Sequence, residues 1–371
     1  MSNPSWHYPR ARLARTVLDA LTAGGAGAIT LFAPRRRGKT EFLLQDLGPL
    51  AAERKLAVVY ASFWQTYEDP PGVLEHAIRT ARERPGLWRR TADAVRAARP
   101  KLRIAPAGIG GEIDLAGNGA ADAVPTDRLL RLDDLIGGLR ATVEMPAVLM
   151  LDEVQELAAP THRPFVAALR TSLDRRRDRL RAVFTGSSVD GLRALFSDRE
   201  APFFHFGTNL DLPPLDDGFV DHMLAAHRVA SGRAVDRDVA RRFFEAHDRS
   251  PFMLRGALER MALGQAEDFD AAARMLLHDL AERGGYATLW RDLSTLQRAV
   301  LVEIASGTRK LTATGVRTRI ATRIGEADAV SPGRVSGALR ALSRRTLIHK
   351  VAGDWAMADP DVARFVQTAD S

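Results

Sequence analysis

Residues 29–44 carry the feature that most constrains this chain: a short apolar segment, a loop that ends in Gly38-Lys39-Thr40, and an apolar helical pattern after it. Strand, loop and helix in this order are the context of a phosphate-binding P-loop. Gly38 would let the backbone approach a phosphate, and Lys39 would reach the β- and γ-phosphates. The Thr40 hydroxyl would ligate Mg²⁺. This segment therefore predicts a nucleotide site.

The predicted loop departs from the G-x-x-x-x-G-K-[ST] pattern at one position, because Ala33 replaces the first glycine. Alanine is the smallest substitute, so we expect the change to affect how the chain enters the loop more than the phosphate cradle itself. Such loops bind phosphates chiefly through backbone N–H groups and the lysine, so the three arginine side chains are expected to point outward. The predicted nucleotide-binding residues are Ala33, Pro34, Arg35, Arg36, Arg37, Gly38, Lys39 and Thr40.

A second segment, residues 147–157, is an apolar run that leads into Asp152 and Glu153. Such a run is typical of a strand buried on both faces of a parallel sheet, and open α/β sheets bind ligands at the carboxyl ends of their strands. Asp152 is expected to hold Mg²⁺ together with Thr40, and Glu153 to orient and deprotonate an attacking water. Together with Lys39, these acids predict a P-loop NTPase that uses ATP and Mg²⁺.

Composition narrows the class of protein further. The 371 residues are 46% hydrophobic and 27% charged, which predicts a globular chain of two or three domains. The net charge of +7 permits binding to nucleic acid or to an acidic partner without requiring either. The chain has no cysteine, which excludes disulfides and thiol catalysis and favours the cytoplasm. No apolar run reaches the length of a membrane-spanning helix, and no histidine spacing is typical of a metal site.

Alternating strand and helix signals predict an α/β domain with a parallel, doubly wound sheet over residues 1–210. Residues 211–285 show only helical patterns and predict a lid. A glycine-rich stretch between Pro100 and Pro125 contains two short alternating runs, which predict a hairpin-like excursion from the α/β domain. The elements expected in the first domain are strands over 29–32, 56–62, 180–187 and 205–212, the strand that leads into Asp152, and a helix over 73–84.

Residues 286–371 predict three helices followed by two short strands, the order of a winged helix-turn-helix. Ser331 is placed as the N-cap of the third helix, with Pro332 at its first position. The basic residues Arg334, Arg340, Arg344, Arg345 and Lys350 fall on this helix and the wing. Such a set would suit double-stranded DNA, but aspartates lie close to the wing and winged helices also bind proteins, so a protein partner stays open.

The motifs as a whole resemble the archaeal-type ATPase family, a group of AAA+ ATPases related to the STAND signalling NTPases and to the Orc/Cdc6 initiators. The loop from Ala33 to Thr40 is similar to the G-P-R-R-x-G-K-T loop of that family, and residues 151–157 are similar to its Walker B segment. Residues 184–188 resemble the strand that carries its sensor 1, and the C-terminal third resembles its winged helix. This resemblance covers nearly the whole chain and implies a nucleotide-driven molecular switch.

The resemblance also implies where the γ-phosphate is sensed. A polar group at the tip of the fourth strand, Ser187 or Thr185, would contact the phosphate or the attacking water, and Ser187 therefore joins Lys39 and Glu153 as a predicted catalytic residue. The family often carries a sensor 2 arginine in its lid, for which Arg249 and Arg255 are the candidates.

One family feature is missing from this sequence. Phe206 stands where the family often has an arginine after a Pro-aromatic segment, so an arginine finger would have to come from Arg193 or Arg199. Because such a finger accelerates hydrolysis by about 10³–10⁵-fold, we expect slow turnover of the isolated chain.

Two classes of function remain. The first is an ATPase whose nucleotide state gates binding to DNA or to a protein partner. The second is a nucleotide-dependent sensor or scaffold without hydrolysis; an Orc/Cdc6-like DNA-binding initiator or regulator follows from kinship alone. Retention of both Asp152 and Glu153 favours hydrolysis. A homo-oligomer is compatible with each class.

Overall fold

The computed structural model describes residues 6–23, 25–65, 68–83, 126–139, 141–187, 192, 195–197, 199–283, 286–345, 347–351, 354–358 and 360–369. The chain divides into two compact units, one with the described residues up to Phe269 and one with those from Asp270 onward. The hairpin predicted between residues 100 and 125 lies outside the described residues. Among those residues, no helix combines the length and the apolar character needed to cross a membrane.

The first unit is built on a parallel five-stranded sheet with the order β5-β1-β4-β3-β2. Every residue of β3 and β4 is buried, which agrees with the mainly apolar sequence of both strands. The predicted parallel sheet is therefore confirmed, although β5 is shorter than expected. The strands are β1 (Ala28–Phe32), β2 (Val58–Ser62), β3 (Ala147–Asp152), β4 (Leu180–Gly186) and β5 (Thr208–Asp211).

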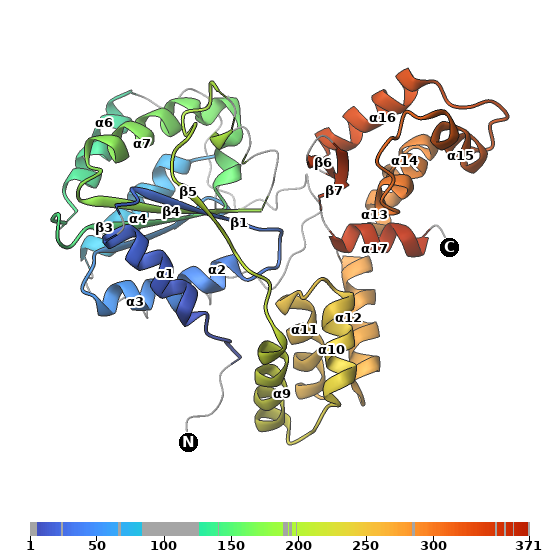
Figure 1. Cartoon of the computed structure of the whole chain (residues 1–371), viewed down its shortest axis with the longest axis horizontal. Coiled ribbons are helices and arrows are strands. Elements are labelled where there is room, and N and C mark those ends of the chain that lie inside the picture. The colour runs from blue at the N-terminus through green and yellow to red at the C-terminus, as the bar shows by residue number, and fades with distance from the viewer. Residues whose placement is uncertain are drawn as a thin grey trace, which may run out of the picture. The chain divides into compact units, whose positions relative to one another are not determined.

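Helices cover both faces of this sheet, as Figure 1 shows. One face packs against the helices that surround the P-loop, and buried residues such as Leu18 and Leu43 form its core. The other face packs against the three helices that precede and follow β3, with Phe165 and Leu132 in its core. The first group is α1 (Ala11–Thr22), α2 (Lys39–Phe42) and α3 (Gly48–Glu53), and the second is α4 (Pro70–Glu83), α6 (Thr126–Gly137) and α7 (Arg163–Arg175). Short 3₁₀ turns at Val154–Ala158 and Pro160–His162 connect β3 to α7.

The helix after the P-loop contains an unexpected π-helical segment, Leu43–Leu47, between α2 and α3. Pro49 lies just beyond it and has no N–H for the preceding turn, while its ring crowds the carbonyl four residues earlier. A local change in the hydrogen-bond ladder follows from this geometry.

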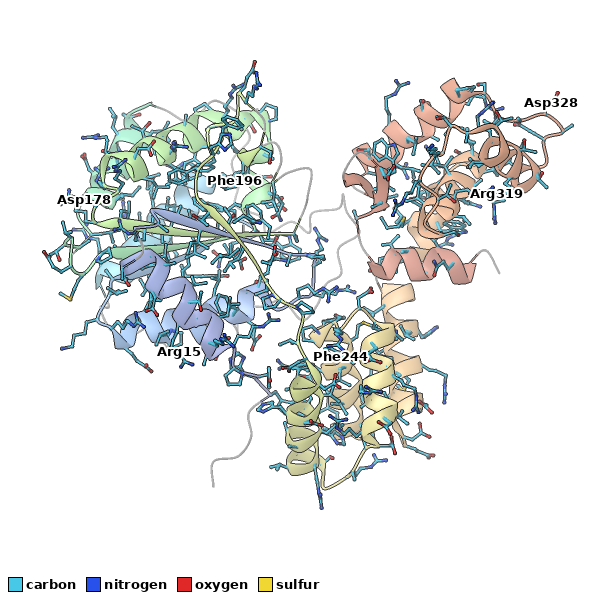
Figure 2. The ribbon with its side chains drawn as sticks, viewed as in Figure 1. Arg15, Asp178, Phe196, Phe244, Arg319 and Asp328 are labelled. Carbon is cyan, nitrogen blue, oxygen red and sulfur yellow. The ribbon has the colours of Figure 1, made fainter. Side chains whose placement is uncertain are left out.

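Three helices after β5 form the helical part of the first unit that the sequence predicts as the lid: α9 (Asp217–Ser231), α10 (Arg237–Ala246) and α11 (Pro251–Ala262). Phe244, labelled in Figure 2, is fully buried there and packs against Phe219 with 5.2 Å between ring centroids. Asp216 occupies the N-cap position of α9, but its side chain makes no capping hydrogen bond.

The second unit contains the predicted three helices and the two-stranded hairpin in the predicted order. Ser331 caps α16 by accepting a hydrogen bond from the Arg334 N–H, as the sequence predicts. Leu301 and Leu342 lie in a separate core formed by α14, α16 and their neighbours. The elements are α12 (Phe269–Arg283), α13 (Tyr286–Asp292), α14 (Thr295–Ala305), α15 (Thr314–Ile324), α16 (Pro332–Arg344), β6 (Ile348–Val351), β7 (Asp354–Met357) and α17 (Pro360–Ala369).

Candidate nucleotide-binding and catalytic site

The P-loop connects the end of β1 to the start of α2 and adopts a conformation that needs two left-handed residues. Gly38 has φ +85° at the N-cap position of α2, and Arg36 has φ +64°. Glycine adopts such angles freely, so Gly38 is well suited to the turn that opens the helix toward a phosphate. Ala33 enters the loop beside β4, where its N–H lies 3.4 Å from the Gly186 carbonyl oxygen.

Lys39 folds back onto its own loop and is 4% exposed. Its Nζ donates hydrogen bonds to the carbonyl oxygens of Ala33 at 2.7 Å and Pro34 at 2.9 Å. Burial lowers the pKa of Lys39, and the charges of Glu153 and Asp152 oppose that shift. An ammonium group held inside a loop of phosphate-binding geometry is placed to exchange these carbonyls for phosphate oxygens.

The two predicted Mg²⁺ ligands lie in contact, although 112 residues separate them. Thr40 Oγ1 donates to Asp152 Oδ2 at 2.7 Å. Asp152 also accepts hydrogen bonds from the Tyr60 hydroxyl at 2.9 Å and from the Thr185 hydroxyl. The parallel register explains the arrangement, because β3 lies between β2 and β4 and all three strands end at the same edge.

The donor set suits magnesium. A hydroxyl and a carboxylate are oxygen ligands, and Mg²⁺ is usually held by one or two such groups while substrate phosphates and waters complete its shell. Within the described ranges, no group of three or more His, Cys, Asp or Glu side chains could hold a metal ion. Thr40 and Asp152 would therefore hold Mg²⁺ together with a nucleotide.

Glu153 follows β3 directly and has a left-handed backbone with φ +55° and ψ +47°. Its Oε2 accepts hydrogen bonds from Ser187 Oγ at 2.9 Å and from Gln155 Nε2 at 2.6 Å. Of the two sensor candidates, Thr185 is fully buried and contacts Asp152, whereas Ser187 lies one residue beyond β4 and contacts Glu153. The structure thus brings Ser187 and Glu153 together and places Thr185 against Asp152.

The three arginines of the loop contact neighbouring residues, and two of them reach the lid. The Arg36 guanidinium lies 4.4 Å from the ring centroid of Phe252, and Arg37 donates to the carbonyl oxygen of Asp248. Arg35 lies 5.7 Å from the ring centroid of Trp64, which is 57% exposed. Arg36 and Arg37 therefore join the P-loop to the first turn of α11 and the residues just before it.

The lid arginines considered for sensor 2 lie against carboxylates of the lid itself. Arg249 Nη2 is 3.4 Å from Glu245 and 3.6 Å from Asp217, and Arg255 Nε is 2.6 Å from Glu259. In this structure both guanidiniums form ion pairs within the lid helices.

The structure describes two of the three positions considered for the arginine finger, and the finger itself stays a prediction. Phe206 packs in an aromatic cluster with Phe184 and Phe203. The Arg170 guanidinium lies over the Phe206 ring, 4.2 Å from the ring centroid. Arg199 is exposed, and Arg193 lies outside the described residues. The aromatic packing explains why a phenylalanine suits this position in the fold.

Sequence reasoning missed an N-terminal contribution to this region. His7 Nε2 lies 2.9 Å from Asp46 Oδ1, and the Tyr8 hydroxyl donates to Asp216 Oδ1 at 3.2 Å. Arg10 donates to the carbonyl oxygens of Arg37 at 3.1 Å and Pro213 at 2.7 Å. Residues 6–10 therefore connect the P-loop and its helix to the lid, which no local sequence pattern indicates.

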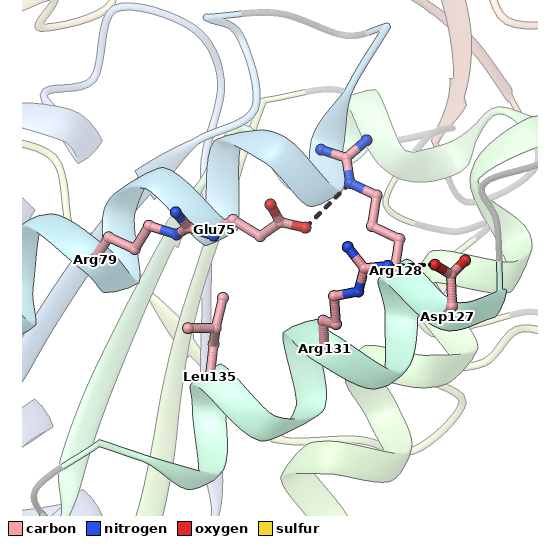
Figure 3. A pocket seen from close by; sticks show the side chains of 6 residues that line it. All are labelled: Glu75, Arg79, Asp127, Arg128, Arg131 and Leu135. Carbon is pink, nitrogen blue, oxygen red and sulfur yellow. Dashed lines mark hydrogen bonds and ion pairs between the residues drawn. The ribbon is translucent and has the colours of Figure 1, made fainter.

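A cavity of about 280 Å³ lies between α4 and α6, and its lining includes Leu135 (Figure 3). Four of its charged side chains form two ion pairs: Arg128 contacts Glu75 at 3.1 Å, and Arg131 contacts Asp127 at 2.6 Å. None of its lining residues belongs to the P-loop, the end of β3 or the lid. The cavity is therefore distinct from the candidate nucleotide site.

In the second unit, the basic residues predicted for partner binding differ in their surroundings. Arg334 forms a two-pronged ion pair with Glu326, with N–O distances of 2.7 and 2.8 Å. Arg340 and Arg345 are exposed, and the side chains of Arg344 and Lys350 lie outside the described part. Glu326 therefore neutralises the first of these arginines.

Solved structures of other proteins share this architecture. No protein-family model and no curated protein matches the chain. Among solved structures, a Walker-type ATPase of Pyrococcus abyssi matches 96% of this chain and 95% of its own length at 18% identity, with a TM-score of 0.62. The ADP form of the ORC2 protein of Aeropyrum pernix matches 97% and 93% at 17% identity, with a TM-score of 0.54. The chain therefore has the α/β P-loop fold of AAA+ ATPases, as in these Walker-type and ORC proteins.

Proposed function

We propose that this chain binds ATP with Mg²⁺ and hydrolyses it, and that its nucleotide state controls binding to a partner. The observation that carries the proposal is the 2.7 Å contact between Thr40 Oγ1 and Asp152 Oδ2 beside the buried Lys39. The P-loop supplies a hydroxyl and a lysine there, and an acid at the end of a buried strand joins them from 112 residues further along the chain. Convergence of these three groups is the arrangement that phosphoryl transfer uses.

Each side chain has a defined role in this proposal. Lys39 and the N–H groups at the start of α2 bind the phosphates, and Thr40 and Asp152 hold Mg²⁺, which neutralises charge on the phosphate oxygens when bound. Glu153 accepts the proton of the attacking water, and Ser187 fixes the carboxylate that does so. Retention of Glu153 at hydrogen-bond distance from Ser187 supports hydrolysis over a sensor or scaffold without turnover.

The contacts between the P-loop and the lid supply the switch. Arg36 and Arg37 reach Phe252 and Asp248, so a phosphate that reorganises the loop would move the lid with it. This coupling supports a STAND-type or AAA+ switch. We propose the lid over residues 211–285 and the winged helix over 286–371 as separate domains. The compact units divide the chain earlier, because almost all of α12 belongs to the second unit.

The proposed partner is double-stranded DNA, with a protein as the alternative. Arg340 and Arg345 are exposed on and just after α16, where they would meet phosphates. The ADP-form ORC2 neighbour supports a nucleotide-binding role of initiator type by its fold. We expect a cytoplasmic location and propose self-association as a further property to test.

The experiment is steady-state ATP hydrolysis with and without duplex DNA at moderate salt, with Glu153→Gln as the blank and Arg340→Ala as the partner variant. Stimulation that falls in Arg340→Ala, while basal turnover stays unchanged, would support DNA binding by α16. Basal turnover without stimulation would redirect the search to a protein partner. If the wild type binds ATP but its turnover does not exceed that of Glu153→Gln, the nucleotide-dependent sensor without hydrolysis would be favoured.

A further inference from the structure

Gln155 is a buried amide at the catalytic edge of the sheet to which the sequence motifs assign no role. It lies in the 3₁₀ turn after β3 and is 9% exposed. Its Nε2 donates to Glu153 Oε2 at 2.6 Å and to Glu156 Oε1 at 3.2 Å, and its Oε1 accepts the Ser187 N–H at 3.1 Å. One amide therefore links Glu153, the acid just after β3, to Ser187, the residue just after β4.

These partners fix which way the amide points. Two carboxylates face its nitrogen and a backbone N–H faces its oxygen, so the reverse orientation would set oxygen against oxygen and N–H against N–H. A glutamate at this position would put a third carboxylate beside Glu153 and Glu156. The position thus calls for a group that donates at one end and accepts at the other.

The fold leaves room for this amide at Gly186. A Cβ atom at that position would lie 2.8 Å from Gln155 Oε1 and 2.6 Å from Leu192 Cδ2. Contacts this short do not occur without movement of the neighbours. The absence of a side chain at the end of β4 is therefore what allows Gln155 to reach across to Ser187.

The geometry also determines how Glu153 is presented. Its left-handed backbone is unfavourable for a residue with a side chain by about 1–3 kcal/mol, so surrounding contacts must hold it. Within the described residues, both hydrogen bonds to the carboxylate fall on Oε2, from Gln155 and Ser187. Oε1 is thereby left for the water that the proposed reaction activates.

We propose that Gln155 is a positioning residue that holds the Glu153 carboxylate and couples it to Ser187 at the end of β4. This inference rests on the proposed ATP hydrolysis. A displacement of Ser187 would be transmitted through its N–H and its hydroxyl to the same carboxylate oxygen. Gln155 touches neither nucleotide nor water in this role and acts through Glu153.

The experiment is a double-mutant cycle between positions 153 and 155. Single-turnover hydrolysis and ATP affinity are measured for the wild type, Gln155→Met, Glu153→Gln and the double variant. Gln155→Met keeps the length of the side chain and removes all three of these hydrogen bonds. Gln155→Glu, which keeps the shape and removes the donor, is the second variant in case Gln155→Met folds poorly. Glu156→Gln is the matched control, because its amide oxygen can still accept from Gln155.

We expect Gln155→Met to lower the hydrolysis rate by about 10²-fold without changing the Kd for ATP, because misplacement of a catalytic group by about 1 Å has an effect of this size. In the Glu153→Gln background the same change should have no further effect, since the two residues act as a unit. Glu156→Gln should retain wild-type turnover.

Three results would overturn the inference. The first is an unchanged hydrolysis rate in both folded Gln155 variants. The second is a loss of rate in the double variant that equals the sum of the two single losses in free energy. The third is a loss of rate in a Gln155 variant that is matched by a loss of ATP affinity. Measurable wild-type turnover with any of these results would leave the proposed function standing. Absence of turnover in the wild type would overturn the proposed function, and this inference with it.

Discussion

His7 gives a prediction in which pH is the perturbation. The ring lies between two carboxylates of the helix after the P-loop, 2.9 Å from Asp46 and 3.6 Å from Glu41, and its side chain is 14% exposed. Burial alone would lower the pKa of His7, but its hydrogen bonds to Asp46 and Glu41 and their charges raise it from 6.5 to about 9. The folded protein therefore binds a proton that the unfolded chain releases near pH 6.5.

The direction of the effect follows from this difference. Between pH 6.5 and about 9 the folded state holds one more proton than the unfolded state, so the free energy of unfolding falls as pH rises. The contribution of His7 is fully present below pH 6.5 and is lost as pH rises through about 9. A pKa increase of this size corresponds to roughly 3 kcal/mol as an upper bound.

The assay is urea unfolding of the wild type and of His7→Gln at several pH values from about 6 to about 9.5. Titrations of other groups largely cancel in the difference between the two proteins. We expect the wild type to be more stable than His7→Gln by up to about 3 kcal/mol at the acidic end and nearly equal to it at the alkaline end. A difference that is independent of pH, or that grows as pH rises, would refute the placement of His7 between the two acids.

Three further predictions concern the P-loop, the core and the second unit. Lys39→Ala should weaken ATP binding by about 10- to 100-fold in equilibrium titration, because it removes a charge-assisted phosphate contact; unchanged affinity would mean that the P-loop assignment is wrong. Phe184→Ala should lower the free energy of unfolding by about 3–5 kcal/mol, since this ring is fully buried; a loss below about 1 kcal/mol would contradict that burial. Ser331→Ala should destabilise the second unit by about 1 kcal/mol in thermal unfolding, because Ser331 caps α16. Ser250→Ala is the matched control, since Ser250 stands at the N-cap of α11 without a capping hydrogen bond, and an equal effect of both changes would argue against the cap.

Local pattern was enough to locate the main elements of the ATPase fold. The P-loop, the buried strand before Asp152 and the capped helix after Ser331 each carry their signal within a short stretch of sequence. The helices at residues 11–22, 126–137 and 163–175 were not predicted, although each is amphipathic. These helices contain none of the motif residues that bind or hydrolyse nucleotides, so no motif marks them in the sequence.

The surroundings of the basic residues in the second unit depend on the tertiary structure. Arg334 counts toward a DNA-binding cluster in sequence, but in the structure its guanidinium forms a two-pronged ion pair with Glu326. Eight positions separate the two residues, which is too far for a helical i, i+4 pair. Only the turn from α15 into α16 brings them together.

The sequence by itself determined which residues we propose for the chemistry, because a P-loop and an acid at the end of a buried strand are defined by neighbours along the chain. Tertiary structure decided which of them meet. Thr40 reaches Asp152 because β3, β4 and β1 lie side by side in the sheet, and Gln155 reaches Ser187 because β4 ends in a glycine. His7 lies against Asp46 because the tertiary structure brings the N-terminal segment onto the helix after the P-loop. Hydrogen bonds between residues tens of positions apart depend on strand order and helix packing, which no local pattern encodes.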